Sequence, residues 1–259
     1  MELGIRGRHA LVMGASRGLG RACAEALARE GVAVTIVARD AGRLERAAAE
    51  IGAGSGAAVT PVSADFRTER GRAAALAACP DPDILVTNAE GAPPGDFREW
   101  SREAWLAGLD DMMLGPIALI RATIDGMAAR GFGRIVNVVS RSVRISQAEL
   151  GLSNGARSGL VGFCAGLARQ VAGRNVTINN LLPGIFAADA QRRHVEGLVA
   201  MTGRPFDEIW AERARASPAG RYGEPAELGA MCAFLCSVQA GYVTGQSVLV
   251  DGGAYPGTV

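Results

Sequence analysis

Apolar runs and amphipathic runs alternate along almost the whole chain. Short runs rich in Val, Ile, Leu and Ala predict seven strands, at residues 9–14, 32–38, 57–65, 83–89, 134–140, 175–183 and 246–251. Between them, segments rich in Ala, Arg and Glu show helical periodicity, at residues 17–31, 41–53, 68–78, 101–130, 155–172 and 225–237. This alternation predicts a series of βαβ units.

The strands are almost continuously apolar, which is typical of a parallel sheet that helices cover on both faces. Right-handed crossovers between such strands give a doubly wound α/β fold of the Rossmann type, here as one domain over residues 1–259. The one long irregular stretch, residues 184–223, is interpreted as a substrate lid and not as a domain boundary. Packing between subunits explains its apolar residues equally well.

Charge and composition narrow the functional classes. The chain has 259 residues, a formal net charge of +1 and neither a basic run nor an acidic tail, so we expect no nucleic acid or anionic lipid partner. The N-terminal residues do not resemble a signal peptide and no apolar run approaches bilayer length, which predicts a cytoplasmic protein without a membrane span.

The five cysteines form no CxxC pair. Cys232 and Cys236 lie one helical turn apart and are expected to share a helix face. We expect buried, reduced thiols and no metal or redox site, because no histidine cluster accompanies them.

A glycine-rich turn, GASRGLG (14–20), joins the first predicted strand to the first predicted helix. Backbone N–H groups in such a turn and at the helix N-terminus bind a pyrophosphate, and glycine permits the sharp bend and the close approach of the ligand. The turn therefore predicts a dinucleotide site. The residues expected to form it are Gly14, Ser16, Arg17, Gly18, Leu19 and Gly20.

Several segments together resemble the short-chain dehydrogenase/reductase family over nearly the whole chain. Glycines 14, 18 and 20 have its GxxxGxG spacing. The other matching segments are VTNAEG (86–91), GRIVNVVS (133–140), TINNLLPG (177–184), RYGEPAELGAMCAFLCS (221–237) and GYVTGQSVLVDGG (241–253). The resemblance implies a seven-stranded Rossmann fold and an oxidoreductase that acts on a carbonyl or alcohol of a small molecule.

Charge at the end of the second strand favours NADP(H). A free ribose 2′-OH is usually held by an acid there, whereas Arg39 suits a 2′-phosphate that Arg17 also approaches. The alternative is a solvated Arg39 followed by Asp40 as a helix N-cap. Glu90 departs from the family, which usually has glycine at that place. The remaining cofactor contacts that the resemblance implies are Asp65, Phe66, Asn88, Ala89, Arg157, Pro183 and Gly184.

The resemblance also implies where the catalytic residues lie. The family uses a serine, a tyrosine, a lysine four residues after the tyrosine and a supporting asparagine. Ser140 matches the serine, but Ser153 stands at the tyrosine position and Arg157 at the lysine position, so YxxxK becomes SxxxR. Met112 stands at the asparagine position, and Ala188 stands where a threonine often contacts the nicotinamide.

These changes remove the usual proton donor. Serine is a far weaker acid than tyrosine, whose pKa is about 10, and it is shorter by a phenyl ring. Arg157 is permanently charged and does not replace a lysine. By spacing, none of Tyr222, Tyr242 and Tyr255 takes the place of the missing tyrosine.

Three functions stay open. The first is an atypical NADP(H)-dependent oxidoreductase with another proton donor. The second is non-redox chemistry beside a structural cofactor, such as cyclisation, elimination or isomerisation, and the third is a catalytically silent NADP-binding partner or sensor. For the first function the candidate donors are Glu90, Arg141, Ser142, Arg144, Gln147, Asp189 and His194. The alternative for a single histidine such as His194 is a solvated side chain.

The resemblance further implies a homo-tetramer or homo-dimer, assembled through helices at about 101–130 and 153–172. The apolar run GLVGFCAGLA (159–168) agrees with a helix face that is buried in an assembly.

Overall fold

The strands of the computed structural model, which describes residues 2–258, form one seven-stranded parallel sheet. The strands are β1 (His9–Met13), β2 (Ala33–Ala38), β3 (Val59–Ser63), β4 (Ile84–Asn88), β5 (Gly133–Val138), β6 (Val176–Pro183) and β7 (Ser247–Val250). Their order is β3-β2-β1-β4-β5-β6-β7, so the direction of winding reverses between β1 and β4. Ligands bind at such a switch point in doubly wound folds.

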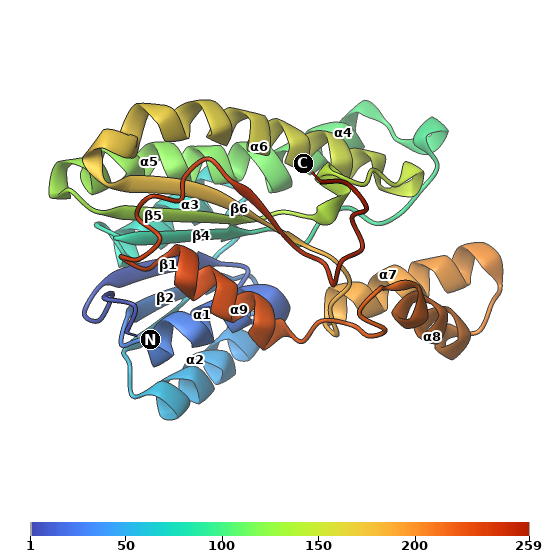
Figure 1. Cartoon of the computed structure of the whole chain (residues 1–259), viewed down its shortest axis with the longest axis horizontal. Helices are drawn as coiled ribbons and strands as arrows, with labels where there is room; N and C mark the ends of the chain where they lie inside the picture. Colours follow the sequence, from blue (N-terminus) through green and yellow to red (C-terminus); the bar gives the residue numbers. More distant parts are fainter. Residues whose placement is uncertain (1, 259) are drawn as a thin grey trace.

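Helices cover both faces of the sheet (Figure 1). One face carries α1 (Gly18–Arg29), α2 (Ala41–Ser55) and α9 (Pro225–Leu235), and the other carries α3 (Glu69–Ala78), α5 (Gly115–Arg130) and α6 (Gly151–Val171). Two apolar clusters fill the layers between the sheet and these helices. The predicted single-domain Rossmann fold is confirmed.

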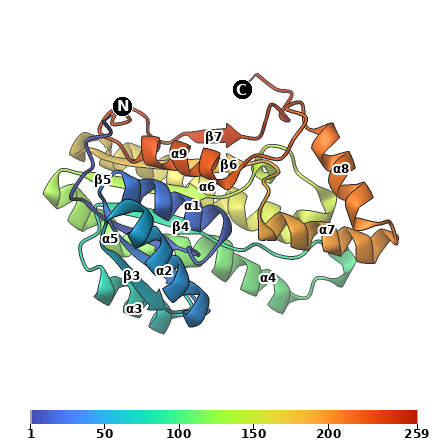
Figure 2. The ribbon, with the colours of Figure 1, turned by 90° about the horizontal axis from the view of Figure 1, so that it is seen from below.

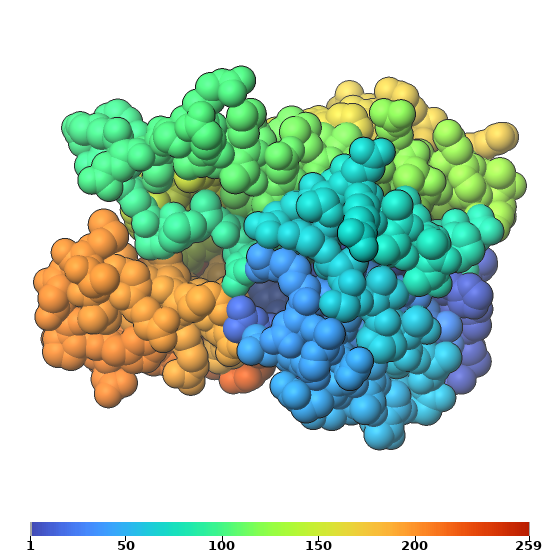
Figure 3. All heavy atoms as spheres, turned by 180° about the vertical axis from the view of Figure 1, so that it is seen from behind, coloured from blue at the N-terminus to red at the C-terminus, as the bar shows by residue number. Residues whose placement is uncertain are grey.

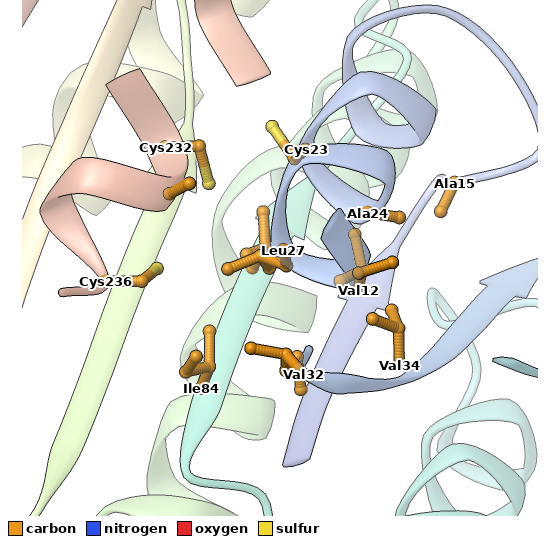
Figure 4. Close-up of a cluster of buried hydrophobic side chains, with 14 of the residues drawn as sticks. Val12, Ala15, Cys23, Ala24, Leu27, Val32, Val34, Ile84, Cys232 and Cys236 are labelled. Atoms are coloured by element: carbon orange, nitrogen blue, oxygen red, sulfur yellow. The ribbon is translucent and has the colours of Figure 1, made fainter. Parts of the chain in front are cut away.

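Helices α1 and α9 pack closely against each other. A Cβ at Gly229 of α9 would collide with the backbone carbonyl of Ala22 in α1, so glycine is needed for this approach. Figure 4 shows Cys232 of α9 facing Cys23 of α1 within the apolar cluster, with Cys236 directly after the end of α9. All five cysteines are buried and free, and hydrogen bonds to Cys23 and Cys236, together with burial, raise the pKa of Cys232.

The helical stretch at 101–130 differs from the single helix that the sequence predicted. It consists of α4 (Arg102–Leu109), a π-helical turn at Asp110–Leu114 and α5. A π-turn of this kind often marks a functional site. By length and composition Arg102–Arg130 would be able to cross a membrane, so the expectation that no apolar run approaches this length was wrong. In this fold its apolar residues, such as Leu119 and Met127, pack into the core against the sheet.

The stretch at 184–223 is not irregular, contrary to the sequence-based expectation. It forms α7 (Asp189–Thr202) and α8 (Phe206–Ala216), which Figures 1 and 2 place beyond one end of the sheet. Trp210 stacks between Phe206 and Tyr222, with ring centroids 5.6 Å and 4.0 Å apart. These stacked rings hold α8 against the segment that precedes α9, although few residues of this stretch reach the main core.

Helix α6 begins at Gly151, earlier than the predicted residue 155. A Cβ at Gly151 would collide with the ring of Trp100, so the first turn of the helix packs directly on that indole. The early start places Ser153 and Arg157 one turn apart on the same helix face.

Candidate functional site

A cavity of about 460 Å³ lies at the carboxyl ends of the central strands. Figure 3 shows a hollow between the orange α7–α8 pair, the green segment around α4 and the blue N-terminal part of the chain. The cavity is lined by these sequence-predicted cofactor residues: Gly14, Ser16, Arg17, Gly18, Leu19, Arg39, Asp65, Phe66, Asn88, Ala89, Arg157, Pro183 and Gly184. The predicted contacts therefore come together from six separate segments of the chain.

The glycine turn is shaped by close contacts that only glycine permits. Gly14 has a φ of +63°, and a Cβ there would lie 2.6 Å from the side-chain nitrogen of Asn88. Asn88 donates a hydrogen bond from this nitrogen to the Gly14 carbonyl, at 3.2 Å. Gly20 lies behind the turn and does not line the cavity, and a Cβ there would collide with the Gly14 carbonyl.

Helix α1 begins in this turn without a side-chain cap at Arg17. The free N–H groups of its first turn and the positive end of its dipole suit an anion.

Glu90 gathers three arginines from distant segments at the mouth of the cavity. Its carboxylate lies 3.1 Å from Arg17 Nη2, 2.9 Å from Arg39 Nη2 and 2.6 Å from Arg193 Nη2. Arg17 also pairs with Asp189 of α7, at 2.9 Å. The acid at the place where the family usually has glycine thus joins the glycine turn, the end of β2 and the lid segment.

Asp65 follows β3 and holds a fourth arginine, Arg67, at the same mouth. It accepts hydrogen bonds from the backbone and the side chain of Arg67, and these contacts lower the pKa of Asp65. Phe66 lies beside it and packs against Gly115 at the start of α5. Arg67 and Arg43 add positive charge to the lining of the cavity.

Ser153 and Arg157 form a buried polar pair at the base of the cavity. Arg157 Nε donates to Ser153 Oγ at 3.0 Å, and Nη1 donates to the carbonyls of Val138 and Val139, at 3.2 Å and 2.6 Å. Nη2 donates to the carbonyl of Ala89 at 3.2 Å. Arg157 therefore ties α6 to the ends of β4 and β5.

Burial lowers the pKa of Arg157 to about 10, so the guanidinium is charged at neutral pH. Ser140, at the end of β5, lies on the same cavity wall. Its Oγ accepts a hydrogen bond from the backbone N–H of Ser142 at 3.1 Å, which leaves its hydroxyl proton free to donate.

The π-turn brings an acid to the cavity that the sequence reasoning did not single out. Asp111 lines the cavity, while Met112, at the expected asparagine position, is buried and does not line it. Burial raises the pKa of Asp111, and the nearby Arg157 opposes this shift. The sequence did contain a signal for this site: Asp111 is an acidic residue in a largely apolar helical stretch, directly before Met112 at the expected asparagine position.

Only some of the candidate proton donors that were expected from the sequence line the cavity. Glu90, Asp189 and His194 line the cavity, whereas Arg141, Ser142, Arg144 and Gln147 do not. Arg193 also lines it, and no local pattern in the sequence distinguished it from other lid arginines. The described cavity wall contains no tyrosine, and the hydroxyl of Tyr222 donates instead to the carbonyl of Trp210.

A family model and several curated proteins match this chain over almost its whole length. Residues 14–255 match the family model described as "Enoyl-(Acyl carrier protein) reductase". The 3-oxoacyl-[acyl-carrier-protein] reductase FabG of Vibrio cholerae is 32% identical over 257 residues, which cover 98% of this chain and 99% of the relative. The NADPH-dependent reductase BacG of Bacillus subtilis is 29% identical and covers 95% of this chain and 97% of its own.

Solved structures agree with this result. The crystal structure of L-sorbose reductase from Gluconobacter frateurii, complexed with NADPH and L-sorbose, superposes with a TM-score of 0.93 at 29% identity. The match covers 99% of this chain and 100% of that one. The chain therefore belongs to the short-chain dehydrogenase/reductase family, in the branch whose family model carries the enoyl-(acyl carrier protein) reductase description.

Proposed function

We propose that this protein is an NADPH-dependent reductase of small carbonyl compounds whose active site lacks the family tyrosine. One observation carries the proposal: the glycine turn and the three residues Ser140, Ser153 and Arg157 line a single cavity. The relatives named above are reductases, and two of them are described as using NADPH or as binding it. In this proposal SxxxR takes the place of YxxxK.

The residues at the cavity mouth fit NADPH. Gly14 and the uncapped start of α1 leave room and free N–H groups for a pyrophosphate. Arg17 and Arg39 point to one carboxylate, that of Glu90, and the same two guanidinium groups suit a 2′-phosphate. When bound, NADPH supplies the hydride, and the chain's own residues orient the substrate and deliver the proton.

Two hydroxyl groups are placed to orient the carbonyl oxygen of a substrate. The oxygen of Ser153 accepts from Arg157, so its proton is free to donate into the cavity. The hydroxyl of Ser140 is free in the same way. Donors fixed in this manner stabilise negative charge that develops on oxygen. Neither serine is acidic enough to give up its proton at neutral pH.

Arg157 acts through position and charge. Its guanidinium fixes Ser153 and the Ala89 loop, and its positive charge favours the developing alkoxide. Because four of its donors are already bound by the protein, a direct contact with the cofactor ribose is limited to its remaining N–H group.

The missing tyrosine also supports a second candidate function. A described cavity lining without the family's proton donor suits a site in which the cofactor is bound but not oxidised. Non-redox chemistry or a silent sensor role follows in that case, and the experiment below separates these functions from reduction.

The proposal includes the assembly, the lid and the cellular location. Segment 184–223, with α7 and α8, is proposed as the substrate lid, and the protein as a cytoplasmic homo-tetramer or homo-dimer. Leu114 before α5 and Phe163 on α6 are large apolar side chains that remain exposed on the expected contact helices. Light scattering at micromolar concentration tests the assembly, and a monomer contradicts it.

A spectroscopic screen at 340 nm tests the reaction. Purified protein is mixed with NADPH and a panel of ketones, aldehydes, imines and enones, beside the double variant S153Y/R157K. Oxidation of NADPH by the wild type with any of these compounds supports the proposal. Oxidation by the double variant alone refutes it and favours the non-redox or silent function.

A further inference from the structure

The turn between β3 and α3 holds one arginine of the cavity wall in a fixed orientation. Three N–H groups of Arg67 contact the two carboxylate oxygens of Asp65: the backbone N–H at 3.1 Å, Nε at 2.9 Å and 3.1 Å, and Nη2 at 2.5 Å. Thr68 caps α3, and the carbonyl of Arg67 accepts a hydrogen bond from Arg72 Nη1 at 2.8 Å. These contacts set the plane of the Arg67 guanidinium.

The same contacts occupy the Asp65 carboxylate. A carboxylate has about four lone-pair sites, and Arg67 makes four contacts with it, so little acceptor capacity is left for an amino group of a ligand. Asp65 binds the edge of the guanidinium, which leaves the faces of that group uncovered by this partner. The Arg67 side chain is 43% exposed and lines the cavity, so a ligand can reach it.

The strand ends place this arginine beside the expected adenosine half of NADPH. Ser63 Oγ, at the end of β3, donates to the carbonyl of Arg39 at 3.2 Å. The next N–H along the chain, that of Ala64, donates to the carbonyl of Ala38 at 3.0 Å. The turn that carries Arg67 therefore lies next to Arg39, the proposed partner of the 2′-phosphate. In NADPH the adenine is attached to the ribose carbon next to the one that carries this phosphate, so the ring lies within reach of the turn.

Both phenyl rings of the described cavity wall are packed against other parts of the chain. They belong to Phe66 and Phe186. The Phe66 ring packs against Gly115 at the start of α5. The Phe186 ring packs against Gly223 and belongs to an apolar core cluster. A planar guanidinium also stacks on aromatic rings, and every base presents such a face whatever groups its edge carries.

We propose that Arg67 stacks on the adenine ring of NADPH, and that this site recognises the face of the base and not its amino group. The inference rests on NADPH binding in the proposed function and is independent of the reaction. A free carboxylate at Asp65 would accept a hydrogen bond from the adenine amino group and would select adenine over other purines. Because Arg67 occupies that carboxylate, the protein accepts a purine that lacks the amino group.

The sharpest test changes the base and leaves the protein unaltered. Reduced nicotinamide hypoxanthine dinucleotide phosphate has a carbonyl where NADPH has its adenine amino group, and it keeps the purine ring and the 2′-phosphate. Calorimetry should give Kd values for the two compounds within about twofold, since stacking tolerates different bases. A site that hydrogen-bonds an amino group rejects an analogue without it by a much larger factor. A preference for NADPH of about tenfold or more would overturn the inference.

A substitution separates the planar group of Arg67 from its charge. Arg67→Lys keeps the charge and loses the plane, so the Kd should rise about fivefold for NADPH and NADH alike, because both carry adenine. The matched control is Arg70→Lys, since Arg70 is exposed on the first turn of α3 and does not line the cavity. An unchanged Kd in Arg67→Lys contradicts stacking, and a loss for NADPH alone would make Arg67 a phosphate contact.

An NMR signal gives a readout that does not depend on affinity. The Nε–H resonance of Arg67, identified by its absence in Arg67→Lys, should shift when 2′,5′-ADP is added, because the ring current of a stacked adenine acts on it. Inorganic phosphate should leave it in place, and equal shifts with both probes would contradict stacking. If the wild type binds no NADPH, the inference and the proposed function both fail. If it binds NADPH and Arg67→Lys behaves as wild type, only the inference fails.

Discussion

Two buried arginines, Arg134 and Arg157, lie at opposite ends of the sheet. Both guanidinium groups are held by hydrogen bonds to protein oxygen atoms, but only that of Arg157 lines the cavity. Arg134, at the start of β5, is 1% exposed, and Arg157, beside the end of β5, is 6% exposed. Each guanidinium donates four hydrogen bonds to oxygen atoms of the protein. Neither forms a salt bridge within 4 Å in the described part of the chain.

Their surroundings differ. At the amino end, Arg134 ties Ser237, after α9, to Asn175, before β6, and its guanidinium stacks on Phe132 at 4.3 Å. At the carboxyl end, Arg157 lines the cavity and lies within electrostatic reach of Asp111. Burial lowers the pKa of both arginines. Arginines bound to backbone carbonyls therefore stabilise both ends of the sheet, but only the carboxyl end, where the cavity lies, presents the charge to a ligand.

The largest expected effect is a loss of stability from a substitution of Arg134, at the amino end of the sheet. Arg134→Met leaves several buried carbonyls and the Asn175 side chain without a donor, so the free energy of unfolding should fall by about 3–5 kcal/mol. Urea denaturation measures this change, and the Kd for NADPH should be unaffected. The control is Arg8→Gln, a half-buried arginine that also stacks on Phe132 and pairs with Asp83 near the surface, with an expected loss of about 1 kcal/mol or less.

At the carboxyl end of the sheet, where the cavity lies, the corresponding substitution of Arg157 should affect both stability and NADPH binding. Arg157→Met should lower the free energy of unfolding by about 2–3 kcal/mol, less than at Arg134, because water in the cavity can reach the released carbonyls. It should also weaken NADPH binding about tenfold, which calorimetry measures. An unchanged Kd would show that Arg157 is as purely structural as Arg134 and would contradict a role of its charge in binding NADPH.

Cofactor discrimination should depend on the arginines of the cavity mouth. Arg39→Ala should raise the Kd for NADPH about tenfold or more and leave that for NADH nearly unchanged, since only NADPH carries the 2′-phosphate. Arg29 is exposed on the last turn of α1, so Arg29→Ala removes the same charge outside the cavity and serves as the control. Equal losses for both cofactors would contradict a 2′-phosphate contact.

The smallest expected effect is a gain of affinity. Glu90 neutralises Arg17, Arg39 and Arg193, and a cofactor phosphate must compete with its carboxylate for them. Glu90→Gln should therefore tighten NADPH binding by up to about fivefold, the range of an exposed ion pair. Glu99→Gln, an exposed acid away from the cavity, should have no effect. Weaker NADPH binding in Glu90→Gln would mean that Glu90 contacts the cofactor directly.

Features that depend on local pattern could be predicted from the amino-acid sequence. The seven strands and the glycine turn follow from apolar periodicity and from the places where only glycine fits, and both act within a few residues. The same holds for the pair Ser153 and Arg157, whose spacing of four brings them together on any helix. The α-helical run from 102 to 130 was visible as well, but its π-turn was not.

Which charged side chains pair with one another depends on the three-dimensional fold. Arg17 and Asp189 are 172 positions apart in sequence, and Arg39 and Glu90 are 51 apart, so no local pattern relates them. The fold also decided that Asp111 and not Met112 reaches the cavity, and that the Nε2 of His194 is buried on the lid. These contacts depend on how the helices and strands pack against one another. The burial that orients a titratable side chain and shifts its pKa comes from residues that are distant in the sequence.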